Sequence, residues 1–253
     1  MLLRVRPAPL AAVLKRLFRM SRIEKEVPGG RFSIDPVSVF GFALLTRGEY
    51  EPGMLATLRT WLRPGGTFVD LGANEGYFSV LAAHLVGETG RVLAIEPQNR
   101  LLPVIAENFR LNGVRNAAVA KVAVSDRSGS ATLYLPPNTN TGGGGLDRAT
   151  RYRVPTQEVT VVTLGDLLEQ HGIAQVDLIK IDIEGFEYEA VLGSPDLFRQ
   201  HRFKAIALEL HPSALERRGK SGSEIEGFLT RAGYALDRRS GHAVWVVAAS
   251  AAA

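Results

Sequence analysis

The octapeptide Val-Asp-Leu-Gly-Ala-Asn-Glu-Gly, residues 69–76, is the most informative segment of this chain. It overlaps a short apolar run typical of a buried strand, residues 67–71, and precedes a run with helical periodicity, residues 77–86. Gly72 allows the backbone to come close to a ligand, and Gly76 allows a tight entry into the helix. A strand, a glycine turn and a helix in this order indicate an α/β sheet with a ligand site at the end of the strand.

The spacing within this turn argues against a bound pyrophosphate. It reads Asp-x-Gly-x-x-x-Gly, whereas turns that bind nicotinamide dinucleotides read Gly-x-Gly-x-x-Gly. A pyrophosphate needs the free N–H groups at a helix N-terminus, and the carboxylates of Asp70 and Glu75 would repel it. The same carboxylates favour a ligand with cationic character. S-adenosylmethionine meets this demand, because it carries an ammonium and a sulfonium and has no phosphate.

Two further acids follow the next two predicted strands. Glu96 ends the strand at residues 91–95, where an acid can accept both ribose hydroxyls of a nucleoside. Asp126 follows the third strand and could accept from an adenine amino group. The alternative interpretation is a helix-capping Asp70, a surface Glu96 and a turn Asp126 with no shared ligand. We favour a cofactor site, whose predicted residues are Asp70, Gly72, Asn74, Gly76, Tyr77, Glu96, Asp126 and Asp182.

The alternation of strands and helices extends along most of the chain. A helix is predicted from Glu51-Pro52 to Leu62, before the octapeptide. The last two predicted strands, 234–236 and 243–247, are joined by a connection too short for a helical crossover, so they pair antiparallel. The pattern predicts an α/β fold with a mostly parallel sheet covered by helices. The other predicted strands after the octapeptide are 91–95, 118–124, 176–183 and 203–210.

Two segments interrupt this rhythm. Residues 130–163 predict an inserted β-hairpin, whose polar loop contains Gly142–Gly145 and either closes over a substrate or lies on the surface. Residues 32–47 predict a second short hairpin. We therefore divide the chain into a helical and hairpin N-terminal extension, residues 1–48, and a main domain, residues 49–253.

Composition and charge limit the partners of this chain. It has 253 residues and no Cys, which excludes disulfides, thiolate metal sites and cysteine nucleophiles. The net charge is +4, but residues 1–31 carry eight basic and two acidic groups, or +6, which leaves −2 for the rest. The main domain therefore offers no basic surface for nucleic acid. Residues 10–18 are amphipathic and could touch an anionic membrane, although packing on the domain is the favoured interpretation. We predict no signal peptide and a cytoplasmic location.

Six segments of the chain carry its strongest motifs: residues 68–78, 94–97, 124–126, 161–164, 177–187 and 208–212. The most specific of them contains Lys180-x-Asp182-x-Glu184-Gly185-x-Glu187. In these segments the chain resembles the FkbM family of class I S-adenosylmethionine-dependent methyltransferases. The resemblance implies a Rossmann-like, doubly wound sheet of seven strands with the last strand antiparallel. It also implies O-methylation of a hydroxyl on a sugar or natural product, and hence a small-molecule or glycan acceptor.

A second polar cluster suggests where the chemistry takes place. Lys180, Asp182 and Glu184 alternate with isoleucines and so lie on one side of their strand, while Glu209 and His211 end the next strand. His211, with an ordinary pKa of about 6.5, is a candidate base for a hydroxyl proton. Glu184 and Glu209 are alternative bases, and Lys180 could orient a substrate oxygen. The predicted catalytic residues are thus His211, Glu184, Glu209 and Lys180.

Other interpretations of this cluster stay open. His211 could simply cap its strand, and Asp182, Glu184, Glu209 and His211 could together hold a divalent cation, although we predict no metal. The leading rival function is a nicotinamide-dependent Rossmann oxidoreductase, which the glycine spacing disfavours. A non-catalytic cofactor-binding domain is a second rival, which the polar cluster disfavours.

Overall fold

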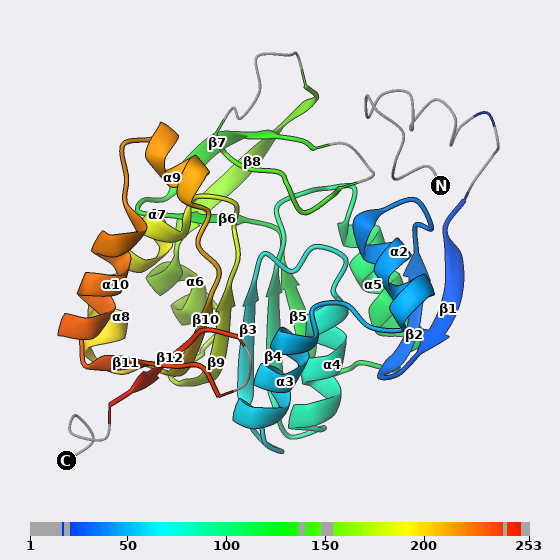
Figure 1. Cartoon of the computed structure of the whole chain (residues 1–253), viewed down its shortest axis with the longest axis horizontal. Helices are drawn as coiled ribbons and strands as arrows, with labels where there is room; N and C mark the ends of the chain where they lie inside the picture. The colour runs from blue at the N-terminus through cyan, green and yellow to red at the C-terminus, as the bar shows by residue number, and fades with distance from the viewer. Residues whose placement is uncertain (1–16, 18–20, 137–139, 148–153, 240–241, 249–253) are drawn as a thin grey trace.

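The computed structural model describes residues 17, 21–136, 140–147, 154–239 and 242–248 (Figure 1). Its centre is a seven-stranded sheet in the order β11-β12-β10-β9-β3-β4-β5. β12 runs antiparallel to both of its neighbours, and the other pairs are parallel. The predicted fold class, a Rossmann-like sheet of seven strands with the last one antiparallel, is confirmed. The strands are β3 (Thr67–Leu71), β4 (Arg91–Ile95), β5 (Ala117–Ala120), β9 (Val176–Ile181), β10 (Phe203–Leu208), β11 (Tyr234–Asp237) and β12 (Val244–Val247).

The strand order reverses between β3 and β9. From β3 the chain continues through β4 to β5, whereas β9 and β10 lie on the other side of β3. Asp70 on β3 is in register with Lys180 on β9. In open α/β sheets the connections diverge at such a point and leave a crevice outside the carboxyl ends of the strands.

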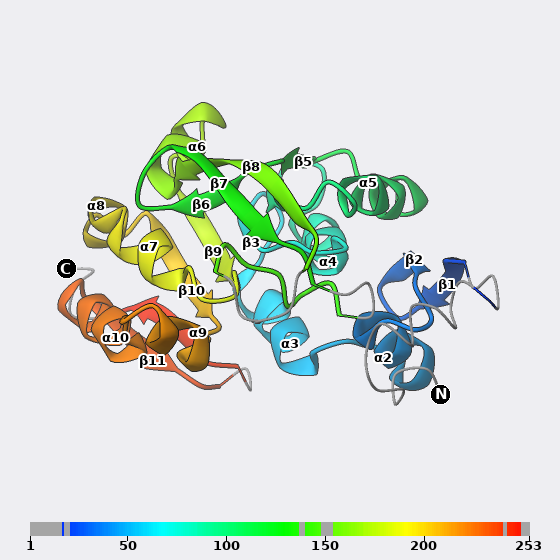
Figure 2. The same ribbon diagram turned by 90° about the horizontal axis from the view of Figure 1, so that it is seen from above.

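Helices cover both faces of the sheet, because alternate residues of each strand point to opposite sides. Phe68 and Leu178 pack with α3, α4 and α5, whereas Val69 and Ile179 pack with α6, α7, α8 and α10. Seen from above, β9 and β3 lie between α7 and α4 (Figure 2). The helices are α3 (Pro52–Trp61), α4 (Tyr77–Val86), α5 (Leu102–Leu111), α6 (Leu164–Gln170), α7 (Glu187–Leu192), α8 (Pro195–Arg199), α9 (Pro212–Arg217) and α10 (Gly222–Arg231).

A small three-stranded sheet stands beside the carboxyl ends of the main sheet (Figure 1). β7 (Gly129–Tyr134) and β8 (Thr156–Thr163) form the predicted inserted hairpin. The predicted single strand at 118–124 is wrong, because it divides after Ala120. β6 (Ala123–Ser125) leaves the main sheet and pairs with β8, where Ala123 joins a separate apolar cluster with Leu133 and Val161.

The predicted hairpin at residues 32–47 is also wrong in its position. The hairpin consists of β1 (Ile23–Val27) and β2 (Gly30–Ile34), and α2 (Val39–Arg47) follows it. The Ser38 hydroxyl caps α2 by accepting from the Gly41 N–H at 2.8 Å. Fully buried Phe32 and Ile34 belong to the same core cluster as α3 and α4. The segment from residue 21 therefore packs into the main domain.

The amphipathic pattern predicted at residues 10–18 lies almost entirely outside the described residues. Of the helices in the described part of the chain, none combines the length and apolarity needed to cross a bilayer.

Candidate active site

Two cavities meet at the carboxyl ends of β3 and β9. The Glu96 cavity, which Glu96 lines with Leu133 and Phe186, has a volume of about 630 Å³. The His211 cavity, which His211 lines with Tyr50, has a volume of about 620 Å³. The residues shared by the two linings are Gly72, Asn74, Gly142, Asp182 and Glu184.

The turn after β3 lines both cavities and requires a glycine at position 72. The φ of Gly72 is +89°, and a Cβ on this residue would lie 1.9 Å from the carbonyl oxygen of Asp182. The Asp182 N–H donates to the Leu71 carbonyl at 3.1 Å, which ties the ends of β3 and β9 together. The sequence predicted that Gly72 lets a ligand come close to the backbone. In the structure, the group that lies against Gly72 is the backbone of Asp182, which follows β9.

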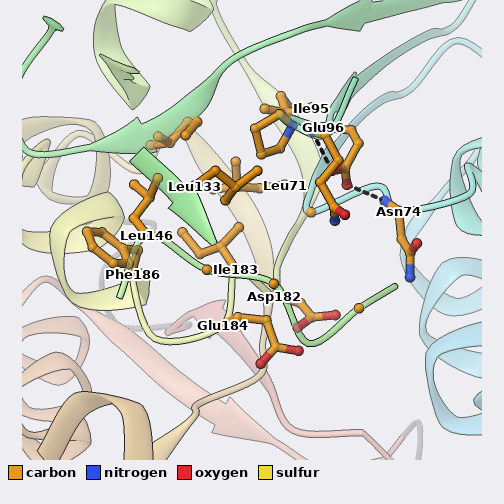
Figure 3. Close-up of a pocket in the computed structure, with 18 of the residues that line it drawn as sticks. Leu71, Asn74, Ile95, Glu96, Leu133, Leu146, Asp182, Ile183, Glu184 and Phe186 are labelled. Carbon is orange, nitrogen blue, oxygen red and sulfur yellow. Dashed lines mark hydrogen bonds between the residues drawn. The ribbon is translucent and has the colours of Figure 1, made fainter. Parts of the chain in front are cut away.

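The Glu96 carboxylate lies in the wall of its cavity and is held by backbone donors. It accepts from the N–H groups of Asn74 and Gln98, each at 2.9 Å, and it is buried (Figure 3). Burial raises the pKa of Glu96 to about 7, because water no longer stabilises its charge. Leu133 and Phe186 form an apolar wall on the side opposite Asn74 (Figure 3).

The glycine loop covers the place where the cavities meet. The Thr141 hydroxyl donates to the Asn74 side chain at 2.8 Å, and the Gln98 side chain donates to the Thr141 carbonyl at 3.0 Å. Gly142 lines both cavities. A Cβ at Gly145 would lie 3.2 Å from the Glu184 carbonyl, which is a tight contact and shows how closely the loop approaches the segment after β9. The described part of the loop, residues 140–147, thus lies against the site.

Asp70 lies near the carboxyl end of β3, but it is not among the residues that line either cavity. Its carboxylate is fully buried, accepts from the Ser79 hydroxyl at 2.6 Å and lies 3.8 Å from Nζ of Lys180. Lys180 in turn donates to Asp182 at 2.9 Å. Burial opposes the charge of Lys180, but the carboxylates of Asp182 and Asp70 outweigh it and raise its pKa. The cation that Asp70 faces is therefore part of this chain.

Three other predicted cofactor residues lie in different surroundings. Tyr77 lines the His211 cavity, where its ring packs against Phe78. Gly76 occupies the position before α4 with a φ of +79°, which supports helix entry as its role. The Asp126 side chain is half-exposed, 3.9 Å from Arg127, and lines neither cavity.

The predicted catalytic residues come together in the His211 cavity. Nδ1 of His211 donates to the Glu187 carboxylate at 3.0 Å. Nε2, on the other side of the ring, lies 3.6 Å from Glu184 and 3.7 Å from Asp182. Glu209 lines the same cavity. Sequence reasoning thus placed these groups at one edge correctly.

The carboxylates around His211 change its proton affinity. Burial lowers the pKa of His211, but Glu187, Glu184 and Asp182 outweigh burial and raise it to about 9. Burial raises the pKa of Glu184 to about 7 and also raises the pKa of Glu209, with further contributions from Asp182. Glu184 has a φ of +56°, which is rare outside glycine and characteristic of functional sites.

Sequence reasoning missed residues on the far side of this cavity. Phe40, Tyr50 and Glu51 line it from the segment before β3. Glu51 has a φ of +47°, and burial raises the pKa of its carboxyl group. The Glu51-Pro52 pair was interpreted only as a helix start, and nothing in the local pattern indicates that the acid faces a cavity.

The group formed by Asp182, Glu184 and His211 has the spacing of a cation site, since one ligand atom from each lies within 4.8 Å of the others. However, the Lys180 ammonium already occupies one oxygen of Asp182. A second cation beside it would be repelled.

Comparison with known proteins places the chain in a family. Residues 70–236 match the family model described as Methyltransferase FkbM domain. A relative named 31-O-demethyl-FK506 methyltransferase FkbM, from Streptomyces tacrolimicus, is 31% identical over 180 residues, which cover 59% of this chain and 67% of that protein.

Two other similarities are more distant. Ribosomal RNA large subunit methyltransferase E of Nitrosomonas eutropha is 36% identical over 37% of this chain, so the chain spans about half (47%) of that relative. The crystal structure of Aeropyrum pernix fibrillarin with bound S-adenosyl-L-methionine has a TM-score of 0.39 at 14% identity, and covers 81% of this chain and 72% of that one.

The lining groups of the two cavities fit S-adenosylmethionine. Glu96 offers a buried carboxylate to a ribose diol, and the wall around Phe186 is apolar enough for adenine. The match to a methyltransferase family confirms the predicted cofactor, S-adenosylmethionine. The chain belongs to the FkbM methyltransferase family.

Proposed function

We propose that this protein is an S-adenosylmethionine-dependent O-methyltransferase that acts on a hydroxyl of a sugar, a glycan or another natural product. The observation that carries the proposal is the junction of the two cavities at Asp182 and Glu184. One cavity has groups suited to a nucleoside, and the other contains His211 with its ring held by a carboxylate.

The Glu96 cavity would hold the nucleoside part of the cofactor. Glu96 would accept from the ribose hydroxyls, Phe186 and Leu133 would pack on the adenine, and Asn74 would hold Glu96 in place. Asp182 would face the methionine end. Asp70 would act through Lys180, which it holds beside Asp182. Asp126, which lines neither cavity, would not contact the cofactor.

The His211 cavity would hold the acceptor. The bound cofactor supplies an electrophilic methyl group on sulfur, and the acceptor hydroxyl must lose its proton as its oxygen takes that group. His211 would receive this proton on Nε2, with Glu184 and Glu209 beside it. The aromatic rings of Phe40 and Tyr50 would pack on the acceptor, as aromatic rings do on sugars and polyketides.

Three observations support oxygen as the methylated atom and a small molecule as the acceptor. The relative from Streptomyces tacrolimicus is named as a 31-O-demethyl-FK506 methyltransferase. A hydroxyl requires a base, and the cavity contains three candidates. The near-neutral charge of residues 32–253 gives no basic surface for ribosomal RNA, the substrate named for another relative. A nicotinamide-dependent oxidoreductase is disfavoured by the family and by the glycine spacing.

Transfer of a labelled methyl group tests this proposal. The whole chain is incubated with S-adenosylmethionine that carries a ¹³C-labelled methyl group and with a panel of glycans and polyketide alcohols. The ¹³C NMR shift of the transferred methyl group then shows which atom carries it. We expect label on oxygen, and loss of transfer in His211→Ala with cofactor binding kept. Label on carbon or nitrogen, or full turnover by His211→Ala, would refute the assignment.

A further inference from the structure

Glu187 is a fully buried carboxylate beside His211. It is the first residue of α7, and its Oε1 accepts from the N–H of Ile183 at 3.2 Å and of Gly185 at 3.0 Å. The same oxygen accepts from Nδ1 of His211 at 3.0 Å. Among the described residues, no group donates to its other oxygen, Oε2.

The two backbone donors alone do not explain a carboxylate at this position. A buried negative charge is costly unless it is compensated, and a neutral amide oxygen would satisfy two N–H groups at lower cost. The partner that gains from a full negative charge is the imidazole. A carboxylate on one ring nitrogen fixes the tautomer and stabilises the ring when the other nitrogen takes a proton.

The opposite nitrogen of His211, Nε2, can take such a proton when the ring is neutral, above its pKa of about 9. Its two closest acids, Glu184 and Asp182, lie at 3.6 and 3.7 Å from Nε2, which is too long for a hydrogen bond. His211 also occupies the N-cap position of α9, where Pro212 follows it and restricts the backbone. The ring is therefore held on the Nδ1 side, with Nε2 toward the cavity.

We propose that Glu187 is a positioning residue for methyl transfer, which holds His211 in the Nδ1–H tautomer and presents the Nε2 lone pair to the acceptor hydroxyl. This inference rests on the proposed function and identifies what prepares its base. As the acceptor oxygen takes the methyl group, the bond from that methyl group to sulfur would break and leave S-adenosylhomocysteine. The hydroxyl proton would pass to Nε2, and the resulting imidazolium would be paired with Glu187. The charge of Glu187 is thus needed most when the proton moves.

The pH dependence follows from the groups that face the ring. Glu187 faces Nδ1 from α7, Glu184 and Asp182 face Nε2 from the segment after β9, and Glu209 and Lys180 lie in the same cavity lining. Removing the charge of Glu187 removes one of three carboxylates that favour the imidazolium. In a plot of kcat against pH, the increase in kcat should then occur at lower pH, and the maximal kcat should fall.

The test compares Glu187→Gln with Glu187→Asp and with a matched control, Glu189→Gln. Glu189 is a buried acid on the same helix, but it pairs with Arg218. Nitrogen NMR shifts of labelled histidine report the tautomer without an acceptor, and the His211 signal is assigned by its loss in His211→Gln. The spectra are recorded at about pH 10, because the ring is neutral only above its pKa of about 9. We expect the Nδ1–H tautomer in wild type and its loss in Glu187→Gln.

Kinetics complete the test. For Glu187→Gln we expect kcat to be about 100-fold lower and the KM for the cofactor to stay within about twofold of the wild-type value. The pH at which kcat rises should also be lower than in the wild-type protein. Glu187→Asp should recover part of the rate, and Glu189→Gln should keep the wild-type pH profile. If Glu187→Gln does not fold, the tautomer of His211 in the wild-type protein still tests the inference, because a ring protonated only at Nε2 would overturn it. Equal pH profiles for Glu187→Gln and Glu189→Gln overturn it as well. A failure of the proposed function would be seen separately: the wild-type protein would transfer no methyl group, whichever tautomer His211 adopts.

Discussion

Lys180 pairs with two carboxylates at the edge of the His211 cavity. Its ammonium is buried between the carboxylates of Asp70 and Asp182. Removing one partner of a buried charge group leaves the others uncompensated, which costs more than the pairing is worth. We expect Lys180→Met to lower the free energy of unfolding by about 3–5 kcal/mol in urea denaturation.

Two further variants separate charge from packing at Lys180. Adding Asp70→Asn to Lys180→Met should recover part of the lost stability, because one stranded carboxylate is removed. Lys204→Met, on the neighbouring strand, breaks an exposed pair with Asp177 and should cost less than about 1 kcal/mol. Equal losses for Lys180→Met and Lys204→Met would contradict this account.

Glu96 gives a prediction for cofactor binding and its pH dependence. The ionised carboxylate is the better acceptor for a ribose diol, and burial raises its pKa to about 7. Affinity for S-adenosylhomocysteine should therefore weaken as the pH falls below about 7, because Glu96 becomes protonated. Calorimetry should show Glu96→Gln binding about tenfold more weakly, as expected for loss of a charged hydrogen-bond acceptor, and with a flatter pH profile. Glu88→Gln, an exposed control, should match wild type at every pH.

At the residue scale, the sequence could predict where acids end strands but not what they face. Glu96 lies where its position after β4 predicted, because the carboxyl ends of parallel strands meet at one edge. Asp70 was expected at the ligand, yet it faces Lys180, because only strand register brings β3 beside β9. Glu51 reaches the cavity through a positive φ that no local pattern indicates.

Among the elements, the glycine loop at residues 140–147 has the clearest testable role. The Thr141 hydroxyl joins it to Asn74 beside both cavities. Thr141→Val keeps the shape of the side chain but loses this bond, which is worth about 1 kcal/mol. We expect S-adenosylhomocysteine to bind about fivefold more weakly with the melting temperature almost unchanged. Thr132→Val, at an exposed position of β7, is the control, and equal affinities for the two variants would refute the role of the loop.

The limits of sequence reasoning are also visible in the elements. The central strands β3, β4, β9 and β10 were predicted well, because buried parallel strands read as continuous apolar runs. The run at 118–124 is equally apolar, but it divides because Ala123 finds partners in the inserted hairpin. Residues 39–47 were assigned to a hairpin, although Ser38 and Gly48 cap them as a helix. Tertiary contacts therefore decided both cases.

At the scale of the whole molecule, the segment before the family match is part of the core. Phe32 lies in β2, outside residues 70–236, yet it is fully buried with the rings and aliphatic chains around α4. We expect Phe32→Ala to lower the free energy of unfolding by about 3–5 kcal/mol in denaturant titrations, because it leaves a cavity. Ile23→Ala, at an exposed position of β1, should cost less than about 1 kcal/mol. A loss below about 1 kcal/mol for Phe32→Ala would mean that residues 21–48 form a separate extension.

Calorimetric titration of the whole chain with S-adenosylhomocysteine, and in parallel with NAD, tests most directly whether the joined cavities are a methyl-donor site. The account predicts saturable binding of one S-adenosylhomocysteine per chain, kept in His211→Ala, and no binding of NAD. Saturable binding of NAD without binding of S-adenosylhomocysteine would contradict it.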